Sequence, residues 1–261
     1  MSVASHALQR GPSFAASTLL LAKREIRNAL RAPSSYVPAL FMPLFFYYVQ
    51  SGSLGRTFAQ GSGLDNYEAF VLPLSLMFAM SNDAAGLNMV VDVERGYFDK
   101  MLLAPVSRIS IVLGAMGASY ARVLVQGTIV CAVTLATGLR FETGLVGVIG
   151  LVLLASFWGI AYAGFGIAVA LKTGNSQATQ GSMFFIFPLM FLTTAFAPME
   201  ALDGWLRTVA RFNPLTYLLD GLRAFSLTGD LGDVPGALAA IFGVAALSLT
   251  LSFKALAGRL K

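Results

Sequence analysis

Long uncharged stretches alternate with short charged ones along this chain of 261 residues. Asp, Glu, Lys, Arg and His are all absent from four stretches, 32–55, 143–171, 173–199 and 234–253. Residues 69–91 contain one charge, Asp83, and residues 109–139 contain one, Arg122. Each stretch provides the ~20 apolar residues that a helix needs to cross a bilayer. The pattern therefore predicts six membrane spans, at about 35–54, 67–91, 109–138, 143–171, 177–198 and 234–256.

Helices are the expected structure of these spans, because backbone polar groups in lipid must be satisfied within the spanning segment. A membrane β-barrel would show alternating strands of ~10 residues, and the sequence has no such pattern. Only 12% of the residues are charged and 56% are hydrophobic, which is too apolar for an ordinary soluble domain. The predicted fold class is an all-α polytopic membrane protein, with residues 1–261 forming a single transmembrane domain.

Two segments outside the spans have amphipathic patterns at helical spacing. Residues 17–32 carry basic residues on one face and apolar residues on the other, which predicts a helix lying in the membrane interface. Residues 200–233 are too polar to be a span but contain many leucines. Asn213-Pro214 divides this segment, since the residue before a proline avoids the helical region. We therefore expect two short external helices that dip into the membrane.

A third short segment, 92–105, connects the second and third predicted spans. A helix over 94–104 would have one apolar side, formed by Tyr97, Phe98, Met101 and Leu102. Arg95 and Asp99 would pair at i, i+4 on the other side, and Pro105 would end the helix. The periodicity by itself fits an anchor lying on the membrane, and it also fits a peg that docks into another protein.

The basic residues indicate how the chain is oriented. The net charge is +5, and 12 of the 18 Lys and Arg residues lie in the segments on the same side as the N-terminus, against five on the opposite side. Basic residues accumulate on the cytoplasmic side of membrane proteins, so both termini are expected in the cytoplasm. This distribution explains the positive charge as a topology signal and argues against a nucleic-acid site.

Three motifs resemble the exporter permeases of the ABC-2 type. The first is the segment between spans two and three, with Asp92, Glu94, Gly96, Leu102, Leu103, Pro105, Ser107 and Arg108. The second is the N-terminal group Arg27, Arg31 and Pro33, followed by Pro43 in the first span. The third is the external segment, with Pro198, Glu200, Leu202, Trp205 and Leu206 and then Asn213, Pro214, Leu215, Thr216, Tyr217, Leu222 and Arg223. The family often has a proline just before the tryptophan helix, where this chain has Asp203-Gly204.

The resemblance implies an ATP-driven exporter in the bacterial inner membrane. Two permease subunits, identical or paralogous, would form the pathway, and two copies of a separate cytoplasmic ATPase would bind ATP and Mg. The coupling helix would contact that ATPase through Asp92, Glu94, Arg95, Gly96, Phe98, Leu102 and Pro105. The external helices would form an outer gate that includes Trp205, Asn213, Pro214 and Tyr217.

The N-terminal stretch is similar to the drug and antibiotic exporters of the daunorubicin-resistance type, which implies efflux of amphipathic compounds. Two alternatives stay open: export of a glycolipid or lipid-linked glycan by the same machinery, and an ion-coupled carrier that works without an ATPase.

The chain itself lacks the residues for ATP binding or hydrolytic catalysis. A phosphate-binding P-loop needs a lysine directly after a glycine, and none of the five lysines follows one. The chain has one histidine, His6, and one cysteine, Cys131, with no cluster at metal-ligand spacing. We therefore expect no enzyme activity, no metal and no cofactor in this chain, and energy supplied by a partner.

The two charges within the spans are predicted to meet. Asp83 lies ~12 Å in from the inner end of span two and Arg122 lies ~20 Å into span three, at 1.5 Å per residue. A buried ion pair between them would fix the two spans to each other. The alternative is a proton or substrate relay, since lone charges within membranes are commonly functional.

Two predicted spans carry aromatic residues at i, i+4 and i+7 or at closely similar spacing. These are Phe41, Phe45 and Tyr48 in the first span, and Phe184, Phe187 and Phe191 in the fifth. Lipid-facing or packed aromatics account for any one of them. Together they predict a substrate pathway, because the resemblance places both spans at the dimer axis and aromatic faces bind flat, cationic or acyl-bearing compounds.

Overall fold

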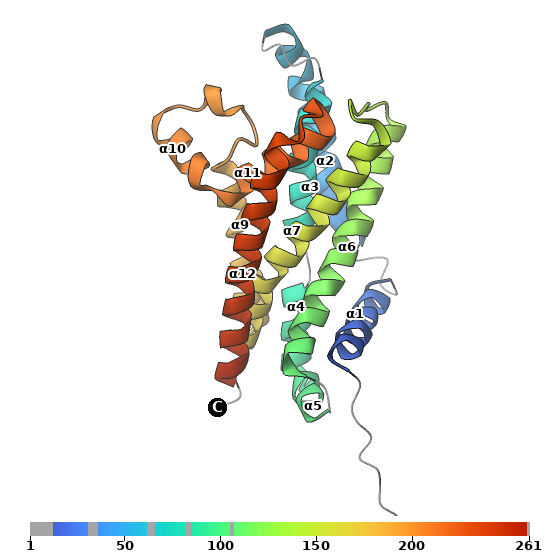
Figure 1. The fold of residues 1–261 in the computed structure, drawn as a ribbon, viewed down its shortest axis with the longest axis vertical. Coiled ribbons are helices and arrows are strands. Elements are labelled where there is room, and N and C mark those ends of the chain that lie inside the picture. Colours follow the sequence, from blue (N-terminus) through green and yellow to red (C-terminus); the bar gives the residue numbers. More distant parts are fainter. Residues whose placement is uncertain (1–12, 31–35, 62–65, 82–84, 105–106, 260–261) are drawn as a thin grey trace, which may run out of the picture.

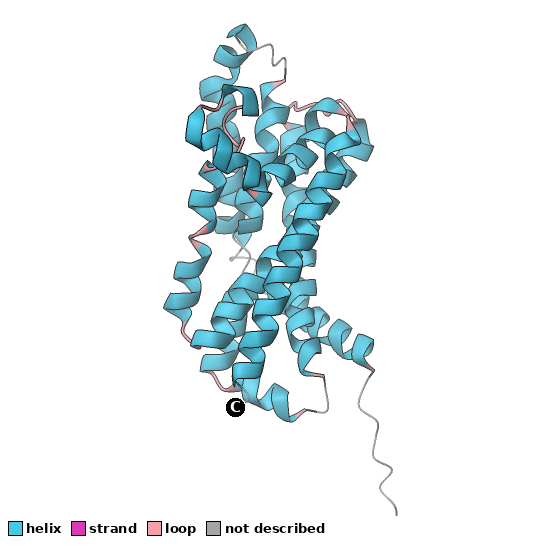
Figure 2. Cartoon of the chain, turned by 60° about the vertical axis from the view of Figure 1, so that its left-hand side comes forward, coloured by secondary structure: helices cyan, strands magenta, loops and turns pink. Residues whose placement is uncertain are grey.

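The computed structural model describes residues 13–30, 36–61, 66–81, 85–104 and 107–259. Within these ranges every regular element is a helix (Figure 2). The helices form an elongated bundle whose lower end in Figure 1 holds α1, α5 and the C-terminal end of α12, while α10 lies near the upper end. This arrangement confirms the predicted all-α class.

Six helices form the body of the bundle, and two of them, α3 and α4, follow each other along one stretch. They are α2 (Tyr36–Gly61), α3 (Tyr67–Ser81), α4 (Ala85–Glu94), α6 (Arg108–Ala136), α7 (Gly144–Thr173) and α12 (Val234–Arg259). In the described residues, four stretches are long and apolar enough to cross a membrane: Tyr67–Glu94, Arg108–Ala136, Gly144–Thr173 and Leu231–Arg259. These correspond to predicted spans two, three, four and six. The helix α2 has 26 residues, about 39 Å at 1.5 Å per residue, but it is not among the four.

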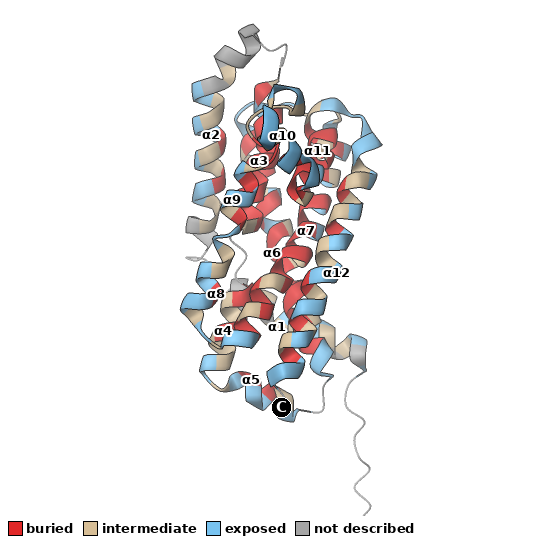
Figure 3. Cartoon of the chain, turned by 90° about the vertical axis from the view of Figure 1, so that its left-hand side faces the viewer, coloured by how far each residue is buried: buried red, intermediate tan, exposed pale blue. Residues whose placement is uncertain are grey.

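The central helix is α7, which packs against α4, α6 and α12. Small residues allow the close approach: a Cβ atom at Gly86 of α4 would lie only 2.7 Å from the backbone of Gly166 in α7. Figure 3 shows the buried residues gathered on α3, α7 and α11, with exposed positions on the outer sides of α2 and α12. The apolar outer surface is that expected of a protein surrounded by lipid.

The fifth predicted span, 177–198, is not a continuous helix. It forms α8 (Ser176–Met183) and α9 (Ile186–Phe191), and the chain after Leu192 is irregular. Pro188 explains the break, because its ring excludes the carbonyl four residues earlier, that of Phe184. The Phe184 carbonyl instead accepts from the Phe187 N–H at 3.1 Å. A charge-free run of sufficient length therefore did not produce a straight span here.

The helix α1 (Phe14–Leu30) begins three residues before the predicted 17–32, and residues 31 and 32 lie outside the described ranges. It packs against α6 at Gly114, where a Cβ atom would lie 2.7 Å from that of Leu21. Leu19 and Leu20 point away from the protein and are exposed. The helix therefore has an apolar contact with the bundle in addition to its exposed leucines.

The upper segment contains the two expected short helices, α10 (Gly204–Phe212) and α11 (Pro214–Arg223), divided at Asn213-Pro214 as predicted. It also contains η2 (Met199–Ala201), the π-helical turn η3 (Ala224–Thr228) and η4 (Leu231–Asp233). The leucines of α11 are fully buried against α3, α7 and α12. By contrast, α10 is largely exposed: the exposed fraction is 70% for Trp205 and 84% for Phe212.

Candidate functional site

At the lower end, the chain turns from α4 into α5 (Tyr97–Leu103) through Arg95 and Gly96. Gly96 has φ of +68°, a left-handed conformation that glycine adopts without steric cost. The expected single helix over 94–104 is therefore interrupted, and Arg95 does not share a helix with Asp99. The predicted i, i+4 pair between them is wrong for this reason. We call residues 92–104 the α4–α5 turn.

An arginine of α1 holds this turn in place. The Arg24 guanidinium donates to both carboxylate oxygens of Asp92, at 2.8 and 3.1 Å, and to the sulfur of Met101 at 3.4 Å. The same guanidinium lies over the Tyr97 ring, 4.5 Å from its centre. Both charged side chains are partly buried. One residue thus joins α1 to the end of α4 and to α5, and sequence reasoning had assigned Arg24 only to the basic face of an interfacial helix.

The other side of the turn is fixed to α8. Glu94 Oε1 accepts from the Ser176 backbone N–H at 2.8 Å and from the Ser176 hydroxyl at 2.7 Å. Ser176 is the first residue of α8, so the carboxylate lies at the positive end of that helix. The predicted contact residues Asp92 and Glu94 are therefore both engaged within the chain.

The exposed surface of α5 is small and apolar at its end. Leu103 is 88% exposed, whereas Phe98 is 1% exposed and packs into the bundle beside Met89. Leu102 is half-buried, Arg95 is exposed, and Pro105 lies outside the described residues. The side chains that face away from the bundle are those of Arg95, Asp99, Lys100 and Leu103, together with part of the Tyr97 ring.

At the upper end, Asn213 joins the external helices to the broken span. Its side-chain amide donates to the carbonyls of Leu189 and Leu192, at 2.7 and 3.0 Å, while its oxygen accepts from the Leu215 N–H at 3.0 Å. The amide thus satisfies carbonyls that the end of α9 leaves open and caps the start of α11. Of the other predicted gate residues, Pro214 occupies the first turn of α11, and Tyr217 donates its hydroxyl to the Arg211 carbonyl at 2.8 Å.

A second buried contact at this end involves Arg223, which is 7% exposed. It donates to the hydroxyl and carbonyl of Thr194, at 3.1 and 2.7 Å, and lies over the Phe70 ring at 3.8 Å. Asp220 lies 3.6 Å away. Burial raises the pKa of Asp220 and lowers the pKa of Arg223 to about 10, each opposed by the charge of the other. Sequence reasoning had named Arg223 as part of the external motif but had given it no partner.

An aromatic-lined cavity of about 280 Å³ opens between α2, α3, α4 and the α8–α9 break. Its aromatic lining residues are Phe46, Phe78, Phe184 and Phe187, and its polar ones are Ser81 and Gln180. Three contacts connect the rings in series: Phe46–Phe78 at 4.1 Å, Phe78–Phe187 at 5.8 Å and Phe187–Phe184 at 5.8 Å. The cavity forms where Pro188 interrupts the fifth span.

The two predicted aromatic stripes lie differently with respect to this cavity. Phe184 and Phe187 line it, and Phe191 is exposed and stacks on Phe196. Phe41, Phe45 and Tyr48 are exposed on a different face of α2, and the adjacent Phe46 supplies the ring that lines the cavity. Periodicity could not select which face of α2 turns toward α8 and α9, and the substrate pathway itself stays a prediction.

The predicted Asp83–Arg122 pair is not tested, because Asp83 lies outside the described residues. Arg122 is buried, and its side chain borders a small space together with Asn88 and Asp92. Among the described residues, no group of three His, Cys, Asp or Glu side chains is placed to hold a metal ion.

Comparisons with known proteins identify this helical bundle as a membrane transport subunit. The family model of the ABC-2 type transporters matches residues 16–226, so the chain belongs to that family. It is 24% identical over 220 residues to the daunorubicin resistance ABC transporter permease protein DrrB1 of Streptomyces coeruleorubidus, covering 80% of this chain and 77% of that protein.

Two further relatives have similar coverage. The probable doxorubicin resistance ABC transporter permease protein DrrC of Mycobacterium tuberculosis is 25% identical over 223 residues, 84% of this chain and 79% of that protein. The putative transport permease ycf38 of Cyanophora paradoxa is 25% identical over 218 residues, 80% of this chain and 74% of that protein. The resemblance seen in the motifs is thereby confirmed.

Proposed function

We propose that this chain is the membrane-spanning subunit of an ATP-driven exporter that removes drugs, antibiotics or similar amphipathic compounds. The family match over residues 16–226 carries the proposal, and the names of two relatives supply the substrate class. ATP and Mg bind to a separate ATPase subunit, present in two copies, and two permease subunits form the pathway. ATP hydrolysis takes place on that partner, not on this chain.

In this proposal the lower end of Figure 1, with α1 and the C-terminal end of α12, faces the cytoplasm of a bacterial cell. Both termini are cytoplasmic in this orientation. The excess of basic residues on that side supports the orientation. α2, with its 26 residues, and the α8–α9 pair complete six crossing segments together with the four long stretches.

The α4–α5 turn is the contact with the ATPase, and α5 is its coupling helix. Closure of the ATPase on ATP pushes on the exposed side of α5. Arg24 carries that movement to α1, and Glu94 carries it to Ser176 at the start of α8. Of the contact residues named from the sequence, the exposed Arg95 touches the ATPase, whereas Asp92, Glu94 and Phe98 are engaged within the chain and position α5.

The first prediction concerns this contact. Replacing the exposed Leu103 by Asp should weaken association with the ATPase roughly tenfold, because an apolar anchor at an interface contributes about 1–2 kcal/mol. Affinity purification of the tagged chain from its native membranes, with quantification of the P-loop ATPase that accompanies it, measures the change. The control is Leu231→Asp, an exposed leucine of η4 at the opposite end.

Equal ATPase recovery with Leu103→Asp and the wild-type chain would show that α5 is not the docking element. If no ATPase accompanies the wild-type chain under conditions that preserve other membrane complexes, the exporter itself is ruled out and the ion-coupled carrier becomes the better hypothesis. A second permease in stoichiometric amount would establish a heteromeric pathway.

The substrate pathway in this proposal includes the aromatic cavity. Phe187 contacts both Phe78 and Phe184, so Phe187→Ala should remove about 1 kcal/mol of aromatic contact with a flat substrate and lower export about fivefold. Cellular accumulation of daunorubicin measures the effect. Phe242→Ala, on the exposed outer side of α12, is the matched control. Unchanged accumulation with Phe187→Ala would place the pathway elsewhere.

A further inference from the structure

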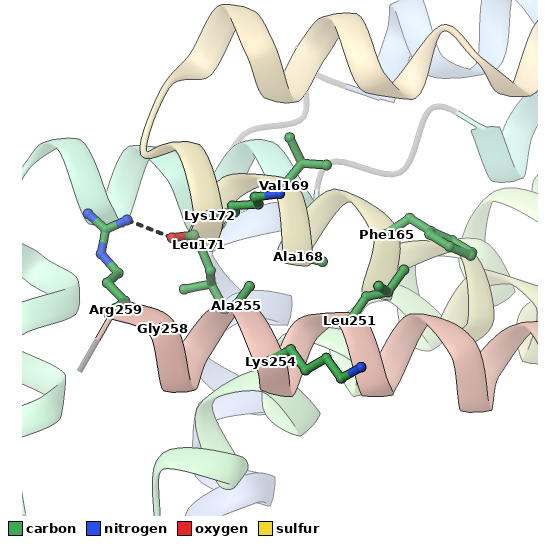
Figure 4. A pocket seen from close by; sticks show the side chains of 10 residues that line it. All are labelled: Phe165, Ala168, Val169, Leu171, Lys172, Leu251, Lys254, Ala255, Gly258 and Arg259. Carbon is green, nitrogen blue, oxygen red and sulfur yellow. Dashed lines mark hydrogen bonds between the residues drawn. The ribbon is translucent and has the colours of Figure 1, made fainter. Parts of the chain in front are cut away.

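A cavity of about 640 Å³ lies between α7 and α12 in the lower part of the bundle (Figure 4). Its apolar wall includes Phe165 and Val169 of α7 and Leu251 of α12. Three cations complete the lining: Lys172 of α7, and Lys254 and Arg259 of α12. The cavity is thus lined mainly by apolar side chains and is bordered by cations on both helices.

The three cations that line the cavity differ in whether they have a partner within the protein. Arg259 donates to the carbonyl of Leu171 at 2.9 Å, which fixes its guanidinium beside the end of α7. Both lysines are exposed, and no carboxylate of the described residues lies within ion-pair distance of either. Figure 4 shows them extending from the two opposite helices that form the cavity. Their positive charge is therefore available to an anion.

The apolar lining continues along the two helices well beyond the cations. Phe165 and Val169 also line a second cavity, of about 330 Å³, which extends along α7 to Trp158 and along α12 to Val244. The 14 residues from Lys172 to Trp158 correspond to ~21 Å of helix. One leaflet of a bilayer has a hydrocarbon depth of ~15 Å, half of the full ~30 Å. A small free anion would contact only the cations. A phospholipid has a negative headgroup for the cations and acyl chains long enough to follow the apolar lining.

We propose that this groove binds one anionic phospholipid. Its phosphate binds at the edge of the groove that Lys172 of α7 and Lys254 of α12 border, and an acyl chain follows α7 and α12 past Phe165. Basic pockets between transmembrane helices at the cytoplasmic surface are suited to such headgroups. Only 17% of the 18-residue apolar stretch of α12 is buried within the protein. The bound lipid would add contacts between this helix and the central helix α7.

The test uses the purified transporter, with any ATPase that accompanies it, in mixed micelles of phosphatidylglycerol and phosphatidylcholine. Native mass spectrometry counts the lipids retained. The wild-type protein should retain phosphatidylglycerol preferentially. Lys172→Gln combined with Lys254→Gln should lower that preference about 25-fold, because each lysine near a phosphate contributes a factor of about five. Lys23→Gln with Arg27→Gln removes two exposed charges of α1, outside the groove, and should leave the preference for phosphatidylglycerol unchanged.

A second variant separates a lipid from a free anion. Leu251→Trp fills space along the apolar wall without changing the charge, so it should lower phosphatidylglycerol retention severalfold. In a separate competition, glycerol phosphate should fail to displace the lipid from the wild-type protein. Three results would overturn the proposal: no preference for phosphatidylglycerol in the wild type, an equal loss in the Lys23 and Arg27 control, or displacement by glycerol phosphate with Leu251→Trp having no effect. Thermal melting of each variant identifies any that is misfolded.

Discussion

Replacing Arg24 by Glu is expected to lower export about thirtyfold while the chain still inserts into the membrane. Arg24 joins three elements, through Asp92, Met101 and Tyr97. A glutamate there faces Asp92 with a like charge and loses the contact with the Tyr97 ring. Both side chains of the ion pair are partly exposed, so about 2 kcal/mol is a reasonable cost, less than the value for a fully buried pair. That energy corresponds to a factor of about 30 in the population of the docked turn.

The reciprocal exchange provides the decisive control. Arg24→Asp combined with Asp92→Arg restores opposite charges, and it should recover a large part of the lost export if the pair acts as a positioning contact. Arg27→Glu makes the same charge change at an exposed position of α1 and should have little effect. Export of daunorubicin and ATPase recovery are measured together, since a loss of export with normal ATPase binding identifies a failure of transmission. No recovery in the exchanged protein, with both single variants inactive, would contradict the positioning role.

The second large effect is expected at Arg223. Arg223→Gln should lower the melting temperature of the purified protein by about 6–12 °C. The guanidinium donates to the hydroxyl and carbonyl of Thr194 and covers the Phe70 ring. Losing charged hydrogen bonds in a buried position costs on the order of 3 kcal/mol, and a chain of this size loses about 2–4 °C for each kcal/mol.

Two further variants make this result specific. Arg211→Gln removes an exposed external cation and should leave the melting temperature within a degree or two of the wild type. Arg223→Lys keeps the charge but lacks the planar fork that reaches both groups of Thr194, so it should rescue only part of the stability. A melting temperature for Arg223→Gln equal to that of Arg211→Gln would show that the buried contacts do not stabilise the upper segment.

The sequence predicted those elements whose residues are determined by the bilayer. A run without charges must form a helix in lipid, and four of the predicted spans match the four long apolar stretches closely. The division of the external segment at Asn213-Pro214 was equally predictable, because proline acts locally on the preceding residue. The motifs also identified the family, and the family model confirms that assignment.

The roles of individual charges were harder to predict, because partners far apart in the chain decide them. Arg24 and Asp92 are 68 residues apart, and Glu94 and Ser176 are 82 apart. Arg223 belongs to the external motif, but the motif did not indicate that Thr194 and Phe70 would surround its side chain. The nearby Arg211 remains exposed.

By itself, then, the sequence determined the helical class, the principal spans and the family, since hydrophobic length and backbone hydrogen bonding in lipid act within each segment. Only the tertiary structure decided which face of each helix is used. It turned Phe46 toward Phe78 and left Phe45 exposed, and it placed Phe98 inside and Leu103 outside at the end of the bundle. The physical reason is that packing depends on neighbours brought together from distant segments, and all faces of a membrane helix are similarly apolar in sequence.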